Sequence, residues 1–391
     1  MTGPVVVVGA GLAGWRVADG IAQHAPDRKV IVLGAELEAP YDRPPLSKQA
    51  LVGARDFTDL MLGRASQTVD VDLRLGVEVV AACNGSVETR SHGIVEAGDI
   101  VWATGVNPIR PTWVPEGNRI HVLRTIADSR RLGECLVPGR SLMIIGGGFI
   151  GCEIAASAVS RGVRVTVIEM ADRLLPGAVH DDIGQLVRAL HEQNGVQVRT
   201  GERVSSISQT AGGVFVATEG GAYVADDVVV GIGGAVDLDP LGDLPLELGG
   251  LACDSVGRVE GHPGMWAVGD VASWTDPILG VRRRREHWTT ATQHASIAAA
   301  AIAGVDVPEA LLHQPPYAWS DQYDVKVQVL GWSEAGERSE WLERDGSTGA
   351  LGYFSGDDLT GVMTVGAPRL LMKHRAAINA FASSRSELSR A

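Results

Sequence analysis

Short apolar runs that end in glycine recur along the chain. Val5–Val8 and Leu142–Ile145 contain only apolar residues, and each is followed by three closely spaced glycines and an alanine-rich stretch of helical composition. An apolar run of this length that turns sharply into a helix is typical of a buried parallel strand. A second run rich in valine and isoleucine, Val30–Leu33 or Val163–Ile168, follows each time and ends near an acid. The pattern therefore predicts an α/β fold in which one nucleotide-binding unit occurs twice.

The remaining pattern predicts further elements of both units and a third unit. We expect a helix over 183–194, a β-meander over 196–224, strands over 228–230 and 266–268, and a helix over 290–303. Beyond Pro315-Pro316 we expect strands over 325–330, 349–354 and 359–365, a helix over 368–382, and a frayed tail from Ser383. The predicted domains are a discontinuous first domain, 1–108 and 234–315, a second domain, 109–233, and a C-terminal α+β domain, 316–391.

Composition excludes several classes of protein. The net charge of −13 disfavours general binding to nucleic acid or anionic lipid, and no apolar stretch is long enough to span a membrane. No export signal is expected before Val5. The cysteines Cys83, Cys135, Cys152 and Cys253 are far apart, so neither a disulfide framework nor a zinc cluster is expected. We expect a protein of the reducing cytoplasm, with Cys152 buried in the core.

The glycine-rich turns predict where phosphates bind. One GxGxxG motif consists of Gly9, Gly11 and Gly14, and the other of Gly146, Gly148 and Gly151. The first glycine permits a tight turn, the second lets backbone approach a pyrophosphate, and the third lets helix pack close to strand. One copy is weak evidence, because such a turn also occurs without a ligand. Two copies between strand and helix, each followed about 20 residues later by an acid, indicate two dinucleotides.

The acids at the ends of the second strands indicate contacts to ribose. Glu169 follows the second strand of the second unit, where a carboxylate accepts both ribose hydroxyls and repels a 2′-phosphate. We therefore expect NADH rather than NADPH, with Arg173 nearby as the feature that leaves NADPH open. In the first unit Ala35 holds the equivalent position, and we expect Glu36 to make the contact.

Further motifs carry a resemblance to a known family. Residues 101–105, Val-Trp-Ala-Thr-Gly, and 266–270, Trp-Ala-Val-Gly-Asp, resemble the ATG and GD motifs of two-dinucleotide-binding flavoprotein reductases. Residues 40–48, 123–125, 286–288 and 319–322, the last reading Trp-Ser-Asp-Gln, closely resemble NADH-dependent ferredoxin reductases that serve oxygenases and cytochromes P450. The resemblance spans residues 4 to about 370. It implies an α/β protein with two Rossmann-like domains, for FAD and NAD, plus a C-terminal α+β domain.

The resemblance also implies roles for single residues. Lys48 and Glu153 resemble a pair beside flavin N5 that tunes the flavin, and no catalytic acid, base or nucleophile is expected. The positions that resemble FAD contacts are Gly9, Gly11, Leu12, Ala13, Gly14, Glu36, Arg43, Lys48, Thr104, Gly105, Arg124, Asp270, Trp288 and Trp319. The positions that resemble NAD contacts are Gly146, Gly148, Phe149, Ile150, Gly151, Glu169 and Glu286. His287 departs from the small hydroxyl residue common in the family, and it is assigned no role.

One dense basic run stands out in the acidic chain. Arg282, Arg283, Arg284 and Arg285 directly precede Glu286, which suggests a docking patch for an acidic ferredoxin near the flavin. A solvated loop without a partner is an equally good interpretation. No closely spaced cysteine pair is present, which disfavours the family members that reduce disulfides.

These features together predict an enzyme that passes electrons from NADH through FAD to a [2Fe-2S] ferredoxin, and indirectly to an oxygenase or cytochrome P450. A flavin reductase of rubredoxin, oxygen or quinone stays open. So does a flavoprotein with a signalling role that resembles apoptosis-inducing flavoproteins. The partner ferredoxin, the terminal oxygenase and the oligomeric state are properties that this one sequence leaves open.

Overall fold

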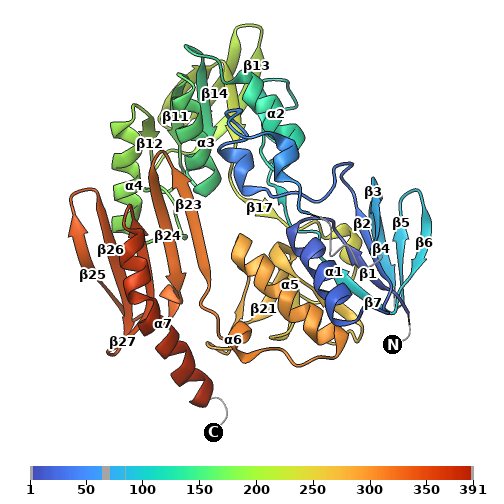
Figure 1. Cartoon of the computed structure of the whole chain (residues 1–391). Helices are drawn as coiled ribbons and strands as arrows, with labels where there is room; N and C mark the ends of the chain where they lie inside the picture. Colours follow the sequence, from blue (N-terminus) through green and yellow to red (C-terminus); the bar gives the residue numbers. More distant parts are fainter. Residues whose placement is uncertain (1–2, 64–70, 84, 389–391) are drawn as a thin grey trace.

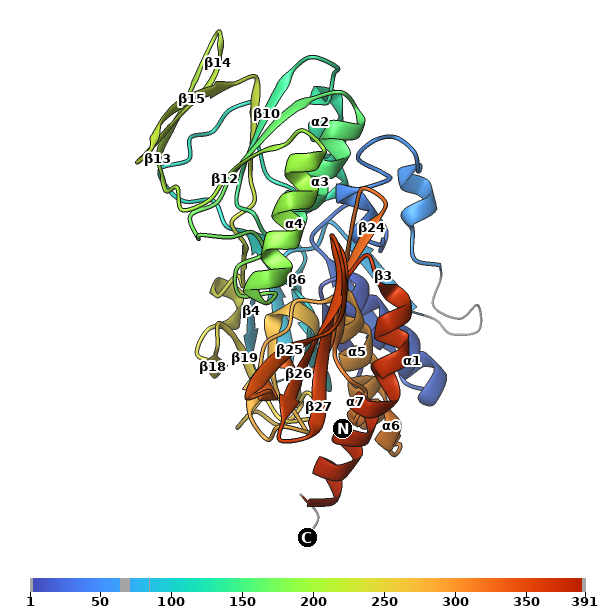
Figure 2. The ribbon, with the colours of Figure 1, turned by 90° about the vertical axis from the view of Figure 1, so that its left-hand side faces the viewer.

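Three five-stranded sheets form the framework of the protein. The computed structural model describes residues 3–63, 71–83 and 85–388. Both chain ends lie at the end of the molecule opposite to a meander of three strands, β13 (Val204–Thr210), β14 (Gly213–Thr218) and β15 (Gly221–Ala225) (Figures 1 and 2). The α/β class predicted from the apolar runs is confirmed.

The first sheet is parallel, in the order β20-β7-β1-β2-β3. Its strands are β1 (Val5–Val8), β2 (Val30–Gly34), β3 (Val71–Leu75), β7 (Asp99–Trp102) and β20 (Met265–Ala267). Every residue of β1 and β2 is buried, which explains why these runs are continuously apolar. Helices α1 (Leu12–His24) and α5 (Trp288–Ala303) pack against each other beside this sheet. The sheet therefore joins segments from both ends of the predicted discontinuous domain.

The second sheet is also parallel, in the order β12-β11-β10-β16-β9. Its strands are β9 (Ile120–His121), β10 (Ser141–Ile145), β11 (Arg164–Ile168), β12 (Gln197–Arg199) and β16 (Asp227–Val230). Its helices are α2 (Ile126–Cys135), α3 (Phe149–Ser160) and α4 (Asp181–Gln193). A capping box at Thr125 and Asp128 starts α2. The nucleotide-binding unit therefore occurs twice, as the repeated pattern predicts.

The third sheet is antiparallel, in the order β23-β24-β27-β26-β25, and α7 (Pro368–Leu388) packs on β24 and β27 (Figure 1). Its strands are β23 (Tyr317–Gln322), β24 (Val325–Gly331), β25 (Arg338–Asp345), β26 (Thr348–Ser355) and β27 (Asp358–Val365). The sequence pattern missed β23 and β25. The predicted frayed tail from Ser383 is also wrong, because α7 continues through Leu388.

Shorter elements complete the described chain. Strand β8 (Asn107–Pro108) pairs with β17 (Gly234–Ala235), so the two segments that connect the first and second sheets lie side by side. The predicted domain boundaries fall there, and this division stays a prediction. The other elements are β4 (Val79–Cys83), β5 (Ser86–Thr89), β6 (Gly93–Glu96), β18 (Leu246–Glu247), β19 (Gly250–Cys253), β21 (Ala272–Thr275), β22 (Arg282–Arg283), α6 (Glu309–Leu312) and 3-10 helices over Pro44–Ser47, Phe57–Leu60, Asp239–Leu241, Gly269–Val271 and Ser333–Ala335. Among the described residues, no helix combines the length and apolar character that crossing a membrane requires.

A buried histidine connects the second unit to the third sheet. His191 in α4 is 0% exposed, and its ring nitrogens lie 3.0 Å from the Tyr323 hydroxyl and 3.0 Å from Gln322 Oε1. Burial lowers the pKa of His191 from 6.5 to about 4. The neutral ring satisfies both partners, because one nitrogen donates to Gln322 and the other accepts from Tyr323.

Acidification should therefore weaken this junction. The unfolded chain binds a proton at His191 below pH 6.5 and the folded chain only below about pH 4, so stability falls as the pH drops through this window. The loss amounts to about 3 kcal/mol. We expect the melting temperature of His191→Gln to change less between pH 4.5 and 7 than that of the parent protein. His24→Gln, an exposed matched control, should retain the parent's slope, and equal slopes for parent and His191→Gln would contradict this account.

Candidate functional site

A cavity of about 1220 Å³ lies where the carboxyl ends of strands from the two parallel sheets meet the third sheet. Small-molecule sites are commonly about 300–1000 Å³, so this cavity has room for more than one small ligand. The first sheet contributes residues 8–13, 33–36, 103–108 and 268–270, the second 148–150 and 229–231, and the third 317–319. Ligands of open α/β sheets bind at such carboxyl ends.

The two glycine loops have the same geometry. Gly9 and Gly146 have φ angles of 111° and 106°, and a Cβ on either would collide with a backbone carbonyl oxygen of the neighbouring loop. Gly11 and Gly148 line the cavity, and a Cβ added to either would have no other atom within 4 Å. They directly precede α1 and α3, and no side chain caps the N-terminus of either helix. The first N–H groups of both helices are therefore available to a phosphate.

The third glycine of each motif has a packing role. Gly14 and Gly151 do not line the cavity, and a Cβ there would collide with the carbonyl oxygens of Gly9 and Gly146. The helix thus lies against its own phosphate loop. The spacing of the motif predicts this arrangement in both copies.

A polar chain follows β2 along the cavity wall. Glu36 accepts hydrogen bonds from the Tyr41 hydroxyl at 2.5 Å and from Arg43 Nη2 at 2.5 Å. Arg43 Nη1 also donates to the backbone carbonyl of Arg124 at 2.6 Å. The carboxylate is one-third exposed and lines the cavity, so it keeps acceptor capacity for a ribose hydroxyl.

Polar groups from three loops gather further along the wall. Arg124 Nη2 lies 3.3 Å from Asp270 Oδ2, which follows β20. Burial lowers the pKa of Arg124. The Thr104 hydroxyl is buried without a hydrogen-bond partner among the described residues, although Thr104 and Gly105 line the cavity. An unpaired buried hydroxyl is costly, so this group is suited to a ligand.

The Lys48–Glu153 pair joins the segment after β2 to α3, and both residues line the cavity. Lys48 Nζ is 2.8 Å from Glu153 Oε1, and both side chains are nearly buried. Ser320 donates to Glu153 Oε1 at 2.7 Å, and Ser47 donates to Glu153 Oε2 at 2.5 Å. The sequence did not predict that these two serines bind Glu153, although both lie in the motifs at 40–48 and 319–322.

An aromatic group closes the side of the cavity formed by the third sheet. The rings of Trp288 and Trp319 meet edge to face at 6.0 Å, and Tyr317 stacks on Trp319 at 5.7 Å. Trp288 Nε1 donates to Asp42 Oδ1 at 2.6 Å, which fixes the orientation of the indole. All three aromatic residues line the cavity. Asp42 and Tyr317 were not identified as site residues from the sequence.

The residues before α5 form another wall. Glu286 pairs with Arg284 at 2.7 Å, and burial raises the pKa of the Glu286 carboxyl. Burial also lowers the pKa of His287, which lines the cavity. His287 thus favours the neutral ring, and Glu286 remains an acceptor that faces the cavity.

The NAD positions divide into two groups. Gly148, Phe149 and Ile150 line the cavity, and Ile150 is 45% exposed. Glu169 is buried behind them, where it accepts hydrogen bonds from the backbone N–H of Gly147 at 2.7 Å and of Ala171 at 2.8 Å. Gly146, Gly151 and Glu169 are not among the cavity-lining residues.

The basic run is not a free cationic patch. Each of Arg282, Arg283, Arg284 and Arg285 pairs with a carboxylate of the same chain, and Arg283 is the most exposed at 37%. Arg282 bonds to Glu247 and Glu260, while Arg285 bonds to Asp276 and Glu334. The charge available to a partner is therefore smaller than four arginines suggest, and both interpretations of the run, docking patch and loop without a partner, stay predictions.

The donor set fits a flavin dinucleotide together with a nicotinamide dinucleotide. Two bare helix N-termini could each receive a pyrophosphate, the carboxylates at 36 and 270 could accept from hydroxyls, and a nearly buried cation, Lys48, lines the same cavity. Fourteen positions resemble FAD contacts, and of these all but Gly14 line the cavity.

Two family descriptions match the chain. "Pyridine nucleotide-disulphide oxidoreductase" covers residues 3–295, and "Reductase C-terminal" covers residues 317–388.

Similar proteins include ferredoxin--NAD(+) reductase components of oxygenase systems. The component of the anthranilate 1,2-dioxygenase system of Burkholderia cepacia is 37% identical over 85% of this chain and 83% of that protein. The component of the p-cumate 2,3-dioxygenase system of Pseudomonas putida is 34% identical over 85% and 82%. In the crystal structure of the covalent putidaredoxin reductase–putidaredoxin complex, a chain 28% identical superposes with a TM-score of 0.89 over 97% of this chain and 93% of that chain. The resemblance inferred from the motifs is confirmed.

Gly14→Ala tests the packing of the phosphate loop. Its Cβ would collide with backbone rather than with a flexible side chain, so we expect unfolding free energy to fall by about 1–3 kcal/mol despite the better helix propensity of alanine. Flavin content, read from absorbance, should fall as well. Gly63→Ala is the control. Gly63 is exposed and a Cβ added there would have no atom within 4 Å, so this variant should keep the parent's stability and flavin content. Equal stability and flavin content in both variants would contradict the packing role.

Proposed function

The chain belongs to the pyridine nucleotide-disulphide oxidoreductase family, and from this premise we propose that it is an FAD-dependent enzyme that transfers electrons from NADH to a [2Fe-2S] ferredoxin. The ferredoxin would serve an oxygenase, as the names of the relatives suggest, or a cytochrome P450, as the resemblance of the motifs implies. The observation that carries the proposal is that both glycine loops open into one cavity, whose lining also includes the Lys48–Glu153 ion pair.

A disulfide substrate is not supported by the cysteines. All four are free, Cys83 is exposed, and Cys152 and Cys253 are buried. Cys152 lies in α3 close to the second glycine loop, and burial raises the pKa of its thiol, which makes it a packing residue rather than a nucleophile. The expectation of a buried Cys152 is confirmed.

The residues of this chain bind and orient rather than react. A bound flavin supplies the conversion of a two-electron donor into a one-electron donor. The N-terminus of α1 and Glu36 would hold its adenosine diphosphate part, and Asp270 with Thr104 would hold the ribityl side. Lys48 would keep a positive charge beside the ring system, with Glu153 fixing its position. Trp288 and Trp319 would exclude water from the same side.

NADH is the proposed donor because of the surroundings of the second strand end. Glu169 is a carboxylate held by two backbone N–H groups, a position in which it would repel a 2′-phosphate. Arg173, the residue that left NADPH open, pairs with Asp172 at 3.0 Å and with Asp181 at 2.9 Å. Its charge is thus already compensated. Glu286 would accept from the nicotinamide carboxamide.

Docking of the ferredoxin near Arg282–Arg285 stays a proposal. Arg283 is the member of the run with the most exposed guanidinium. Its ion pair with Glu334 is 3.4 Å long, so an acidic partner could replace this contact at a small cost.

Purified protein should be yellow, and NADH without air should bleach it within seconds. Added [2Fe-2S] ferredoxin should then be reduced faster than rubredoxin, quinone or oxygen, which stopped-flow absorbance can follow in one series. Oxygen outcompeting every ferredoxin tested would point to an oxidase, and bleaching slower than seconds would favour a signalling role. A colourless protein that takes up no FAD would overturn the proposal.

Glu169→Gln should shift the choice of donor. Loss of the charge removes repulsion of a 2′-phosphate and weakens the ribose contact, so we expect KM for NADH to rise about tenfold or more while KM for NADPH falls. Glu192→Gln, at an exposed acid of α4, is the control. The melting temperature shows whether the loop at Gly147 is intact, and an unchanged ratio of the two KM values at an unchanged melting temperature would exclude Glu169 from donor recognition.

A further inference from the structure

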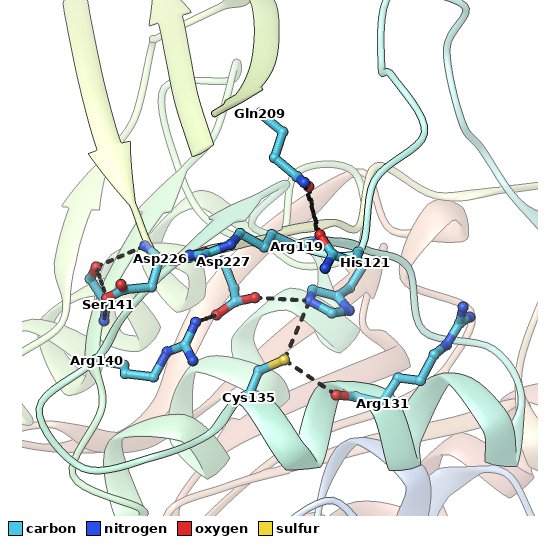
Figure 3. A network of polar contacts seen from close by, with 10 residues as sticks. Arg119, His121, Arg131, Cys135, Arg140, Ser141, Gln209, Asp226 and Asp227 are labelled. Carbon is cyan, nitrogen blue, oxygen red and sulfur yellow. Dashed lines mark hydrogen bonds and ion pairs between the residues drawn. The ribbon is translucent and has the colours of Figure 1, made fainter. Parts of the chain in front are cut away.

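A histidine, a cysteine and an aspartate, none of which lines the cavity, meet at the edge of the second sheet. His121 ends β9, Cys135 ends α2, and Asp227 begins β16 (Figure 3). Their potential ligand atoms all lie within 4.8 Å of one another. The residues are brought together by the parallel pairing of β9 with β16 and by the packing of α2 beside it.

The two contacts of the imidazole converge on the same nitrogen. His121 Nε2 lies 3.2 Å from Asp227 Oδ1 and 3.7 Å from Cys135 Sγ, as Figure 3 shows. One ring nitrogen carries either one proton or one lone pair, so carboxylate and thiol share it, while the thiol also donates to the Arg131 carbonyl at 3.4 Å. A cation placed between the three groups would satisfy the lone pair, the thiolate and the carboxylate together.

The surroundings resemble those of a bound metal. Arg140 Nη2 binds Asp227 Oδ2 at 2.6 Å, which orients the carboxylate and leaves Oδ1 directed at the histidine. Ligating carboxylates are commonly fixed by such outer hydrogen bonds. The side chains of His121 and Asp227 are 7% and 3% exposed, whereas Cys135 is half-buried, so the cluster is accessible from the side of Cys135.

We propose that His121 Nε2, Cys135 Sγ and Asp227 Oδ1 bind a zinc ion, with water as the fourth ligand. Nitrogen, thiolate and one carboxylate oxygen are a donor set that suits this borderline-soft ion better than magnesium or calcium. The ion would clamp the end of α2 to β9 and β16. The sequence did not predict the site because its residues are far apart in the chain: Cys135 follows His121 by 14 residues, and Asp227 follows His121 by 106.

Burial raises the pKa of the Cys135 thiol to about 11, and Asp227 adds to this effect while Arg140 opposes it. The metal-free site therefore holds a thiol, whose proton leaves when the metal–sulfur bond forms. The free energy needed to remove this proton lowers the affinity of the site for a metal. A site whose cysteine is already a thiolate would not have this cost.

Cobalt(II) is a suitable probe, because its d–d bands lie at longer wavelengths than flavin absorption and respond to thiolate ligation. Flavin-loaded protein without a histidine tag should bind one cobalt per chain with a thiolate spectrum, and zinc should displace it. Cys135→Ser should lose the thiolate bands, whereas Cys83→Ser, at an exposed cysteine outside the cluster, should keep them. No cobalt spectrum, or one that survives unchanged in Cys135→Ser, would overturn the proposal.

A second measurement needs no variant at the site. In the unsubstituted protein, zinc should slow alkylation of Cys135 by iodoacetamide at least tenfold and leave Cys83 unchanged, as peptide mass spectrometry can show. Zinc should also raise the melting temperature. Equal alkylation of Cys135 with and without zinc would overturn the proposal even if Cys135→Ser fails to fold. Neither readout depends on electron transfer, so the zinc site and the proposed function can fail separately.

Discussion

One buried carboxylate connects the units built on the three five-stranded sheets. Glu153 belongs to α3 of the second unit, Ser47 and Lys48 to the loop after β2 of the first, and Ser320 to β23 of the third sheet. A buried charge without partners costs several kcal/mol, so the three donors must stay in place together. Ser157, also in α3, donates to the Ser47 carbonyl at 2.7 Å and strengthens the same junction. The position of the cavity walls follows from this arrangement.

For the proposed function the consequence is that two nucleotide sites would share one space. The glycine loops are local features, and each could form in a separate protein. The Lys48–Glu153 pair joins the first unit to α3 of the second, and Ser320 joins α3 to the strand that carries Trp319 and Tyr317, which line the same cavity. A positive charge next to the ring system of a bound flavin favours its reduced, anionic form. The geometry therefore supports transfer between two cofactors more than binding of either one alone.

The sequence predicts those features that depend on neighbours in the chain. Both glycine motifs, the buried runs that precede them and the ends of β7 and β20 could be identified because strand, turn and helix follow one another directly. Contacts between distant segments could not. The sequence alone does not distinguish Ser47 and Ser320 from other serines, because their role depends on the hydrogen bonds that both donate to Glu153 in the folded chain. The arginines at 282–285 looked like a free patch because their carboxylate partners, such as Glu247 and Glu334, are remote in sequence. Strand β25 was missed because its residues are mostly exposed.

The claim that the Lys48–Glu153 pair governs transfer between the two cofactors can be measured directly. Glu153→Gln keeps the side-chain volume and removes the charge that compensates Lys48. The stopped-flow rate at which NADH bleaches the flavin should fall at least tenfold in this variant while the protein still carries FAD. Full flavin content with an unchanged bleaching rate would contradict the account.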